Sequence, residues 1–405
     1  MTNLQLAILN ALLYLTLFLV HYLRSKRITV GIFLAFVYTA IACFCIVSVN
    51  NEPSKWSLTL WPFIYLFICV YFFLRPMLVN TKLNIRFESS DYPIYKKIAQ
   101  IYICMSLFSC LVYLPVAYEH ILNPQWADLY TESHEVKETN FFIKISNLFF
   151  HIRYLGLILF FYFLTYGAKI KFHVLMGISA ILPVLLVTIC NASRGGLIAL
   201  AVSVILTYFM FSSYLSKKIK RFLKTMLLLI LPVGVIYVVA VTLARFDPSI
   251  SYVSAEDSVT YYLGHSMLMF NYGLVDTINR YWYGNYMFGL GELPYNGTHY
   301  GTDFFTIVGA FYQDFGPILS FILILFISKY FDKIFKKKQI GIPEFFLILT
   351  YSMLVFNGVF VVGVGYGIQF IEAFLIYYIL KKYQKKKTYV RSNSILSSTV
   401  SSNNP

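Results

Sequence analysis

Residues 4–23 read LQLAILNALLYLTLFLVHYL, and residues 24–27 read RSKR. The first run is long enough to cross a hydrocarbon core of about 30 Å as a helix that rises about 1.5 Å per residue. Neither a basic segment before it nor a small-residue cleavage site after it marks a removable signal peptide, so we expect a retained first span. The basic cluster that follows indicates the cytoplasmic side of the membrane.

The composition of the whole chain also indicates a membrane protein. The sequence has 405 residues, of which 59% are hydrophobic and 13% charged, and its mean hydropathy is +0.68. These values predict an all-α, polytopic integral membrane protein. The net charge of +15 raises the question of nucleic acid. The basic residues lie in short clusters between apolar blocks, which indicates membrane orientation, and we expect no nucleic-acid partner.

Hydropathy predicts about eleven transmembrane helices, with 10–12 as the range. They are expected at residues 4–23, 28–49, 58–76, 98–118, 145–166, 172–190, 195–214, 223–243, 304–328, 343–362 and 366–380. We expect one transmembrane domain over residues 1–387. The polar, Ser-rich segment 388–405 is predicted to be a disordered cytoplasmic tail.

Lysine and arginine counts predict the orientation. If residues 24–27 are cytoplasmic, alternation places 26 of the 33 basic residues inside and 7 outside. The N-terminus is then outside and the C-terminus cytoplasmic. Two long loops fall outside, an acidic one at about 119–144 and a Tyr- and Gly-rich one at about 244–303. Loops of this length are usually functional or disordered, and the second one is too aromatic for disorder, so we expect an extracytoplasmic active site there.

The stretch CNASRGGL (190–197) predicts an anion site. Ser193 is a good N-cap for the following helix, Gly195 and Gly196 let a ligand approach the backbone, and the guanidinium of Arg194 matches phosphate oxygens. The alternative is that Arg194 extends to lipid phosphates at the interface. Arg153 is a further intramembrane charge inside the predicted span 145–166.

Two further arginines are expected on the outer side. Arg245 follows the eighth span and is predicted to reach the same outer cavity, with a local pair to Asp247 as the alternative. Arg280 lies among aromatic residues, where it either binds an anion or sugar or belongs to an interfacial aromatic belt.

His299 is the candidate proton acceptor. An imidazole titrates near neutrality and can take the proton of a sugar hydroxyl, and Asp303 is near enough in sequence to orient it. The alternative is a merely solvated loop histidine, and His265 is a weaker candidate. No metalloprotease, Walker or nucleotide-binding motif is present, and the six cysteines form no CxxC pair, so we expect neither a metal nor a cofactor.

Several short motifs occur in a characteristic order. They are Ser193-Arg194-Gly195, Tyr261-Tyr262-Leu263-Gly264 followed by Phe270-Asn271, Tyr283-Gly284, and Gly301-Thr302 leading to Tyr312-Gln313-Asp314-Phe315-Gly316. On about eleven spans with a long outer loop before the last three, this order resembles the bacterial O-antigen and oligosaccharide repeat-unit polymerases, which are related to the O-antigen ligases. The resemblance covers residues of about 140–380.

The resemblance implies a fold like that of the C-type lipid-dependent glycosyltransferases and a location in the bacterial cytoplasmic (inner) membrane. It implies that undecaprenyl-pyrophosphate-linked oligosaccharide is both donor and acceptor, and that the product is O-antigen or capsular polysaccharide. Membrane lipid and a chain-length-regulating membrane protein are the further partners. No nucleotide sugar is used, and no metal is required.

The resemblance also assigns roles. Arg194, Arg245 and Arg280 would bind the pyrophosphate leaving group, and His299 matches a histidine that related ligases place before the corresponding late span. Those ligases usually have Asn after this histidine, whereas Tyr300 follows here. For Asp314 we favour a structural role that holds the turn at Gly316, with pairing to an outer arginine.

Two other functions remain open. A ligase that transfers finished glycan shares nearly all these features and differs mainly at the Tyr-x-Asp-Phe-Gly turn. A flippase or transporter for the lipid-linked repeat unit would need charges spread through several spans.

Overall fold

The computed structural model describes residues 1–80, 83–84, 91–122, 141–167, 170–191, 193–245, 263–275, 278–290, 306–360 and 365–401. Within these ranges the chain is helical and contains no strand. This agrees with the all-α fold that composition predicts.

Helices occur in every predicted range. The first eight ranges hold α1 (Asn3–Ser25), α2 (Val30–Asn51), α3 (Leu60–Val79), α4 (Tyr92–Leu122), α6 (Phe141–His151) with α7 (Arg153–Tyr166), α8 (Ile170–Cys190), α9 (Arg194–Phe211) and α10 (Lys217–Arg245). The last three hold α13 (Ile307–Phe335), α14 (Ile342–Asn357) and α15 (Tyr366–Ser401). Short helical turns lie between them, namely η1 (Pro53–Lys55), η2 (Phe270–Val275) and α12 (Asn285–Phe288).

The lengths of these helices fit a membrane. Among the described residues, seven helices are long and apolar enough to cross one, and α7 and α14 are shorter apolar helices. The chain is therefore a multi-pass membrane protein, while the number of eleven crossings stays a prediction. The predicted span 145–166 differs in detail, because it divides at Ile152 into α6 and α7. α15 is helical to Ser401 and so extends through most of the predicted tail.

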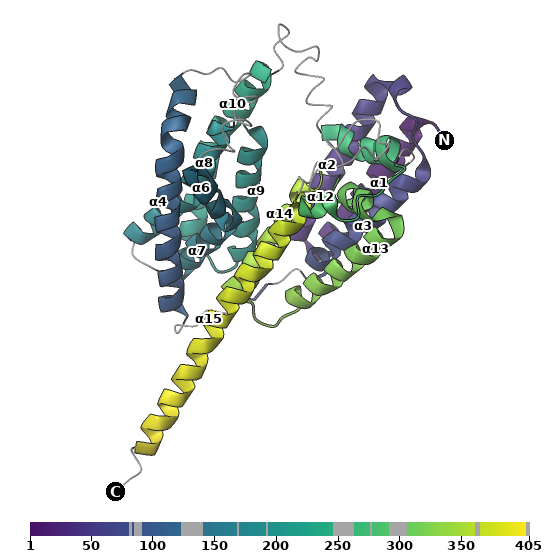
Figure 1. Ribbon diagram of the computed structural model, residues 1–405. Helices are drawn as coiled ribbons and strands as arrows, with labels where there is room; N and C mark the ends of the chain where they lie inside the picture. Colours follow the sequence, from purple (N-terminus) through teal and green to yellow (C-terminus); the bar gives the residue numbers. More distant parts are fainter. Residues whose placement is uncertain are drawn as a thin grey trace.

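The helices form two groups with α14 between them (Figure 1). One group contains α1, α2, α3 and α13, and the other contains α4 and α6 to α10. α14 contacts α7 and α9 of the second group as well as α2 and α13 of the first. Figure 1 shows the N-terminus and the C-terminal part of α15 at opposite ends of the molecule.

Side chains from both groups hold α14. The Tyr38 hydroxyl of α2 donates to the Val355 carbonyl at 3.0 Å, and the Tyr351 hydroxyl of α14 donates to the Phe73 carbonyl of α3 at 2.7 Å. The ring of Phe211 in α9 packs 5.1 Å from that of Phe345. Both groups are thus anchored to one buried helix by polar and aromatic contacts, which suits packing in lipid, where apolar burial alone gives little driving force.

Part of the predicted outer loop 244–303 is buried. Residues 263–275 are helical and pack among α1, α2 and α3, and the backbone of Gly264 lies so close to α2 that a Cβ there would stand 2.7 Å from the Phe44 carbonyl oxygen. The Asn271 side chain accepts from the backbone N–H of Thr59 and donates to its carbonyl, at 3.0 and 2.7 Å. This segment is therefore part of the helical core and not a solvated loop.

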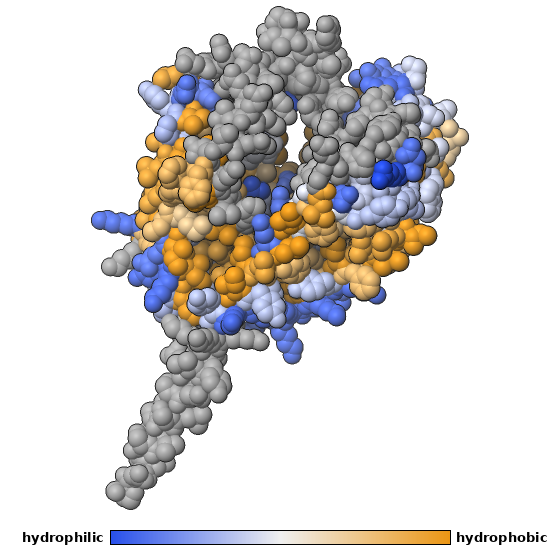
Figure 2. Space-filling model, viewed as in Figure 1, coloured by the Kyte–Doolittle hydropathy of each residue, from blue (hydrophilic) through white to orange (hydrophobic). Residues whose placement is uncertain are grey.

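The surface agrees with a membrane location. Figure 2 shows a belt of hydrophobic residues that crosses both helix groups, with hydrophilic residues below it. Above the belt, some hydrophilic residues lie between the two groups on this face. An exposed apolar belt of this extent is typical of a surface that faces lipid.

Candidate functional site

The break between α6 and α7 places a charged side chain inside an apolar helix pair. At the break, Ile152 donates to the Phe149 carbonyl and Leu155 donates to the Ile152 carbonyl, so the hydrogen bonds span three residues instead of four. Such a tightened turn within a helix often marks a functional position. The Tyr102 hydroxyl of α4 donates to the carbonyl of Arg153, the first residue of α7, at 3.3 Å and holds the break against α4.

The turn between α8 and α9 faces this break. Ser193 is the N-cap of α9, and its hydroxyl oxygen accepts from the Gly196 N–H at 3.1 Å. The Ser193 N–H donates to the Thr188 carbonyl, which also accepts from the Tyr237 hydroxyl of α10. A Cβ on Gly196 would lie 2.7 Å from the Thr188 hydroxyl oxygen, so glycine is what lets the two helices approach. The sequence prediction of an N-cap at Ser193 is confirmed.

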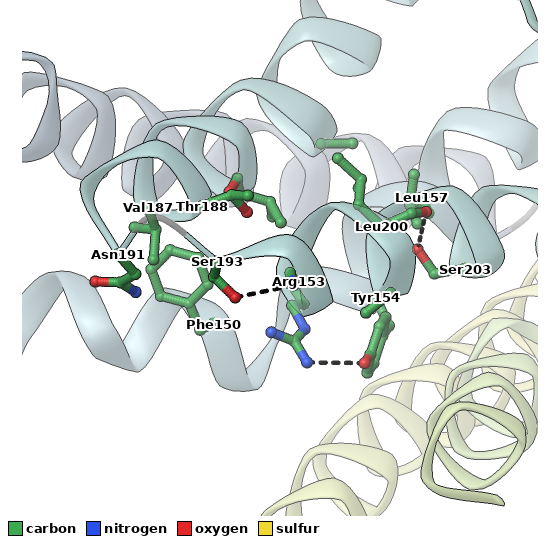
Figure 3. A pocket seen from close by; sticks show the side chains of 14 residues that line it. Phe150, Arg153, Tyr154, Leu157, Val187, Thr188, Asn191, Ser193, Leu200 and Ser203 are labelled. Carbon is green, nitrogen blue, oxygen red and sulfur yellow. Dashed lines mark hydrogen bonds between the residues drawn. The ribbon is translucent and has the colours of Figure 1, made fainter. Parts of the chain in front are cut away.

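A cavity of about 160 Å³ lies between these elements. Its polar lining residues are Arg153, Tyr154, Thr188, Asn191, Ser193 and Ser203, and the others are Phe150, Leu157, Ala180, Val184, Val187, Gly196, Ala199 and Leu200. Figure 3 shows Asn191 and Ser193 toward one end of the cavity and Ser203 with Leu157 toward the other, with the guanidinium of Arg153 below them. A cavity lined by a cation and several hydroxyls can hold a small anion.

Arg153 has donors to offer such an anion. One terminal nitrogen of its guanidinium donates to the Tyr154 hydroxyl at 2.8 Å, and the guanidinium carbon lies 4.8 Å from the Tyr154 ring centre. Arginine carries five N–H donors in a planar fork, so this bond leaves others for a ligand. Gly195 adds a backbone N–H in the exposed first turn of α9, where a Cβ would meet nothing nearer than the Ser193 hydroxyl oxygen at 4.0 Å.

None of the three arginines predicted from the sequence to bind pyrophosphate is shown at this cavity. Arg194 is the half-buried first residue of α9 and follows the cap, but neither it nor Arg280 is among the described lining residues. Arg280 is exposed and belongs to the segment 278–290, which is bonded to α13. Arg245 ends α10 and its side chain is not described, and His299 and Asp303 lie outside the described residues.

Asp314 is fully buried in the other helix group. Its carboxylate oxygens accept from the backbone N–H groups of Tyr286 and Met287 at 3.1 and 2.8 Å, at the start of the short helix α12. Two residues later Gly316 interrupts α13 with φ 70°, and a Cβ there would lie 2.9 Å from the Tyr281 ring. These contacts agree with the favoured structural role, and the described partners are backbone groups, not an arginine.

His265 is also buried and lies outside the candidate membrane spans. Its ring packs edge-on against Trp56 with centres 4.8 Å apart. Burial, with a smaller contribution from Lys55, lowers the pKa of His265 to about 3. With so low a pKa, the imidazole of His265 does not hold a proton near neutral pH. His265 is therefore a weak candidate for the proton acceptor.

Arg153 stands out in the sequence as an intramembrane charge, but the sequence alone did not assign it to the anion site. The signal was an arginine inside an apolar run, which is a functional hypothesis by default. Asn191 lies in CNASRGGL but was given no role, and Tyr154, Thr188 and Ser203 carried no signal. Hydroxyl and amide residues are common in membrane helices, and only the packing of α7, α8 and α9 brings these four together.

No family model matches the chain, and no curated protein or solved structure matches it. A function for the site therefore has to be inferred from its geometry and from the sequence. Among the described residues, no group of three His, Cys, Asp or Glu side chains could hold a metal ion.

Proposed function

We propose that this protein is a membrane glycosyltransferase that joins undecaprenyl-pyrophosphate-linked oligosaccharide repeat units into O-antigen or capsular polysaccharide. The observation that carries the proposal is the cavity where Arg153 of a broken membrane helix lies near the capped start of α9. A guanidinium and a helix N-terminus both favour a negatively charged group. The order of the sequence motifs, which resembles that of the repeat-unit polymerases, also supports this proposal.

The main requirement of the proposed reaction is stabilisation of the negative charge that develops on the leaving pyrophosphate. A hydroxyl of the acceptor sugar attacks the anomeric carbon of the donor glycan. The bond from that carbon to the pyrophosphate oxygen breaks, and undecaprenyl pyrophosphate leaves with the electron pair. The hydroxyl proton passes to a base, for which His299 is our assignment. Groups that bind the leaving pyrophosphate lower the barrier because negative charge grows there in the transition state.

The residues proposed for pyrophosphate binding are therefore revised. Arg153 joins Arg194 and Gly195 in the proposed pyrophosphate site, with Ser193 shaping the turn. Arg245 is retained because it ends the helix α10 that packs on α9. Arg280 is assigned to the acceptor side, since it lies in the segment bonded to α13.

A flippase for the same lipid-linked repeat unit is the second candidate. The hydrophilic residues between the two helix groups favour it, because a transporter binds its substrate between packed helix bundles (Figure 2). An O-antigen ligase would use the same pyrophosphate chemistry and differs only in the acceptor.

Deletion of the gene in the source organism tests the class of function. We expect single repeats on the lipid carrier or on the core, and a full glycan ladder when the gene is restored. Full-length polymer that stays on undecaprenyl pyrophosphate would contradict the polymerase in favour of a ligase. Single repeats trapped at the cytoplasmic face would contradict it in favour of a flippase.

Substitution of Arg153 tests the site. We expect Arg153→Gln to lower the polymerisation rate on the order of 100-fold, as for the loss of one preorganised donor to a developing anion. Tyr154→Phe removes one bond to the guanidinium and keeps the charge, so its loss should be smaller. The protein level and thermal midpoint of each variant in membranes are the controls. An Arg153→Gln protein that is stably inserted and makes full ladders would exclude this cavity as the pyrophosphate site.

A further inference from the structure

A second and larger cavity lies away from the proposed active site, between the second half of α13 and the first part of α15. Its volume is about 750 Å³. The lining residues are Met287, Phe326, Ile327, Lys329, Tyr330, Phe331, Asp332, Lys333, Lys336, Phe370 and Phe374. Neither the motifs nor the proposed reaction uses any of them.

One part of this groove is apolar and open. Phe326 is 66% exposed, and Phe370 and Phe374 of α15 are half-buried. The rings of Tyr330 and Phe374 approach to 5.3 Å and join the two helices. In a membrane protein, an open groove walled by phenylalanine is a surface on which an acyl chain can lie.

The other part of the groove is basic. Lys329, Lys333 and Lys336 follow Phe326 on α13 at intervals of three and four residues, so they continue the same face of the helix. Lys336 forms an ion pair with Asp332, with 2.6 Å between its Nζ atom and a carboxylate oxygen. Asp332 also accepts a hydrogen bond from the Asn80 side-chain amide at 3.0 Å. Neither Lys329 nor Lys333 forms an ion pair with a described residue, so two positive charges remain at this end of the groove.

Two neighbouring lysines, Lys337 and Lys381, have a structural role because they form ion pairs between helices. Lys337 lies 2.8 Å from a carboxylate oxygen of Glu344, and Lys381 lies 3.6 Å from the same oxygen. These two lysines connect the end of α13 and the helix α15 to α14 through the buried carboxylate of Glu344. Lys329 and Lys333 are exposed on the groove and have no such partner among the described residues.

We infer that this groove binds an anionic glycerophospholipid of the cytoplasmic leaflet, with its phosphate at Lys329 and Lys333 and an acyl chain along Phe326 and Phe374. The charge distribution of the sequence predicts that this end of α13 is cytoplasmic, and the cytoplasmic leaflet carries anionic head groups that basic pockets between helices recognise. The undecaprenyl pyrophosphate substrate does not fit this groove, because its charged group is expected at the opposite membrane face. The inference uses the predicted orientation but not the proposed activity.

Lipid binding to the purified full-length protein tests this inference. The delipidated protein is titrated with phosphatidylglycerol or with phosphatidylcholine of the same acyl chains, and bound lipid is counted by native mass spectrometry. We expect tighter binding of phosphatidylglycerol, and we expect Lys329→Gln/Lys333→Gln to weaken it about tenfold or more, since each lysine near an anionic surface contributes about fivefold. Phosphatidylcholine binding should change little.

Two matched variants keep the test decisive. Lys329→Arg/Lys333→Arg retains both charges and should retain the preference, which also shows that the site tolerates substitution. Lys217→Gln/Lys218→Gln removes two exposed lysines from the start of α10 and should leave the preference intact. Equal affinity for the two lipids, an unchanged preference in Lys329→Gln/Lys333→Gln, or full competition by soluble glycerol 3-phosphate would each overturn the inference.

Discussion

Among the described residues, the helix α13 is interrupted at Gly316 and the apolar segment of α6 and α7 at Ile152, and the polar groups beside these two breaks have different partners. At Gly316 in α13, the neighbouring Asp314 is fully buried, and its carboxylate accepts from backbone N–H groups at the start of α12. At Ile152, between α6 and α7, the neighbouring Arg153 is half-buried and lines a cavity. The first break is closed by the protein's own backbone, whereas the second opens onto a volume that a ligand can enter.

The difference separates structural polar residues from candidate functional ones. A buried carboxylate that accepts two N–H groups from its own chain stabilises the fold and has little capacity left for a substrate. A guanidinium with one described bond and a cavity beside it keeps donors for an anion. In both places, a charged residue within an apolar helix indicates a candidate functional residue. Only the partners of each side chain distinguish the structural role from the functional one.

The largest effect on stability is expected at the closed break. Asp314→Ala leaves two buried N–H groups of α12 without their charged acceptor and should destabilise the protein by about 3 kcal/mol, since hydrogen bonds to charged groups contribute about 1.5–3 kcal/mol each. Asp314→Asn keeps one carbonyl acceptor and should lose about half as much. The thermal midpoint in detergent measures both. Wild-type stability of Asp314→Ala would show that the two breaks do not differ as described.

A smaller effect is expected from the glycines beside the open break. Gly196→Ala places a Cβ 2.7 Å from the Thr188 hydroxyl oxygen and should cost about 1–2 kcal/mol through overpacking of α8 against α9. Gly195→Ala meets open space and is the matched control, so its thermal midpoint should stay close to that of the wild type. Thr188→Ala should restore part of the loss in Gly196→Ala. Equal effects at the two glycines would contradict the close approach of the helices.

The smallest effect concerns pH. The pKa of the buried His265 is lowered to about 3, so between about pH 3 and 6.5 the unfolded chain binds a proton that the folded chain does not. Folding stability should therefore fall as the pH drops, by about 1 kcal/mol between pH 7 and 5.5 from this group. His265→Phe keeps a ring against Trp56 and should reduce the pH dependence by that amount. An unchanged slope of the thermal midpoint against pH would show that His265 is not held neutral.

The sequence predicts the helices well because membrane spans depend on local composition. The span expected at 172–190 is α8, Ile170–Cys190, and the Ser193 cap that starts α9 was read from CNASRGGL alone. The break at Ile152 was missed because no proline or glycine lies at that position, and the polar residues His151 and Arg153 beside it do not by themselves end a helix.

Contacts between distant segments could not be predicted. The bonds of Asp314 to Tyr286 and Met287 join residues 28 and 27 positions apart, and no local pattern encodes such a pairing. The burial of 263–275 among α1, α2 and α3 was missed because the surrounding loop 244–303 is rich in Tyr and Gly, although 263–275 itself is mostly apolar.

Coupling of purified lipid-linked repeat units is the decisive test of the proposed polymerase activity. The protein is reconstituted into vesicles with a synthetic undecaprenyl-pyrophosphate-linked oligosaccharide and no nucleotide, and products are separated by mass. We expect glycans of two and more repeats, with one undecaprenyl pyrophosphate released for each bond formed, and strongly reduced coupling by Arg153→Gln. Movement of the lipid-linked oligosaccharide across the bilayer without any coupling would exclude a polymerase and identify a flippase instead.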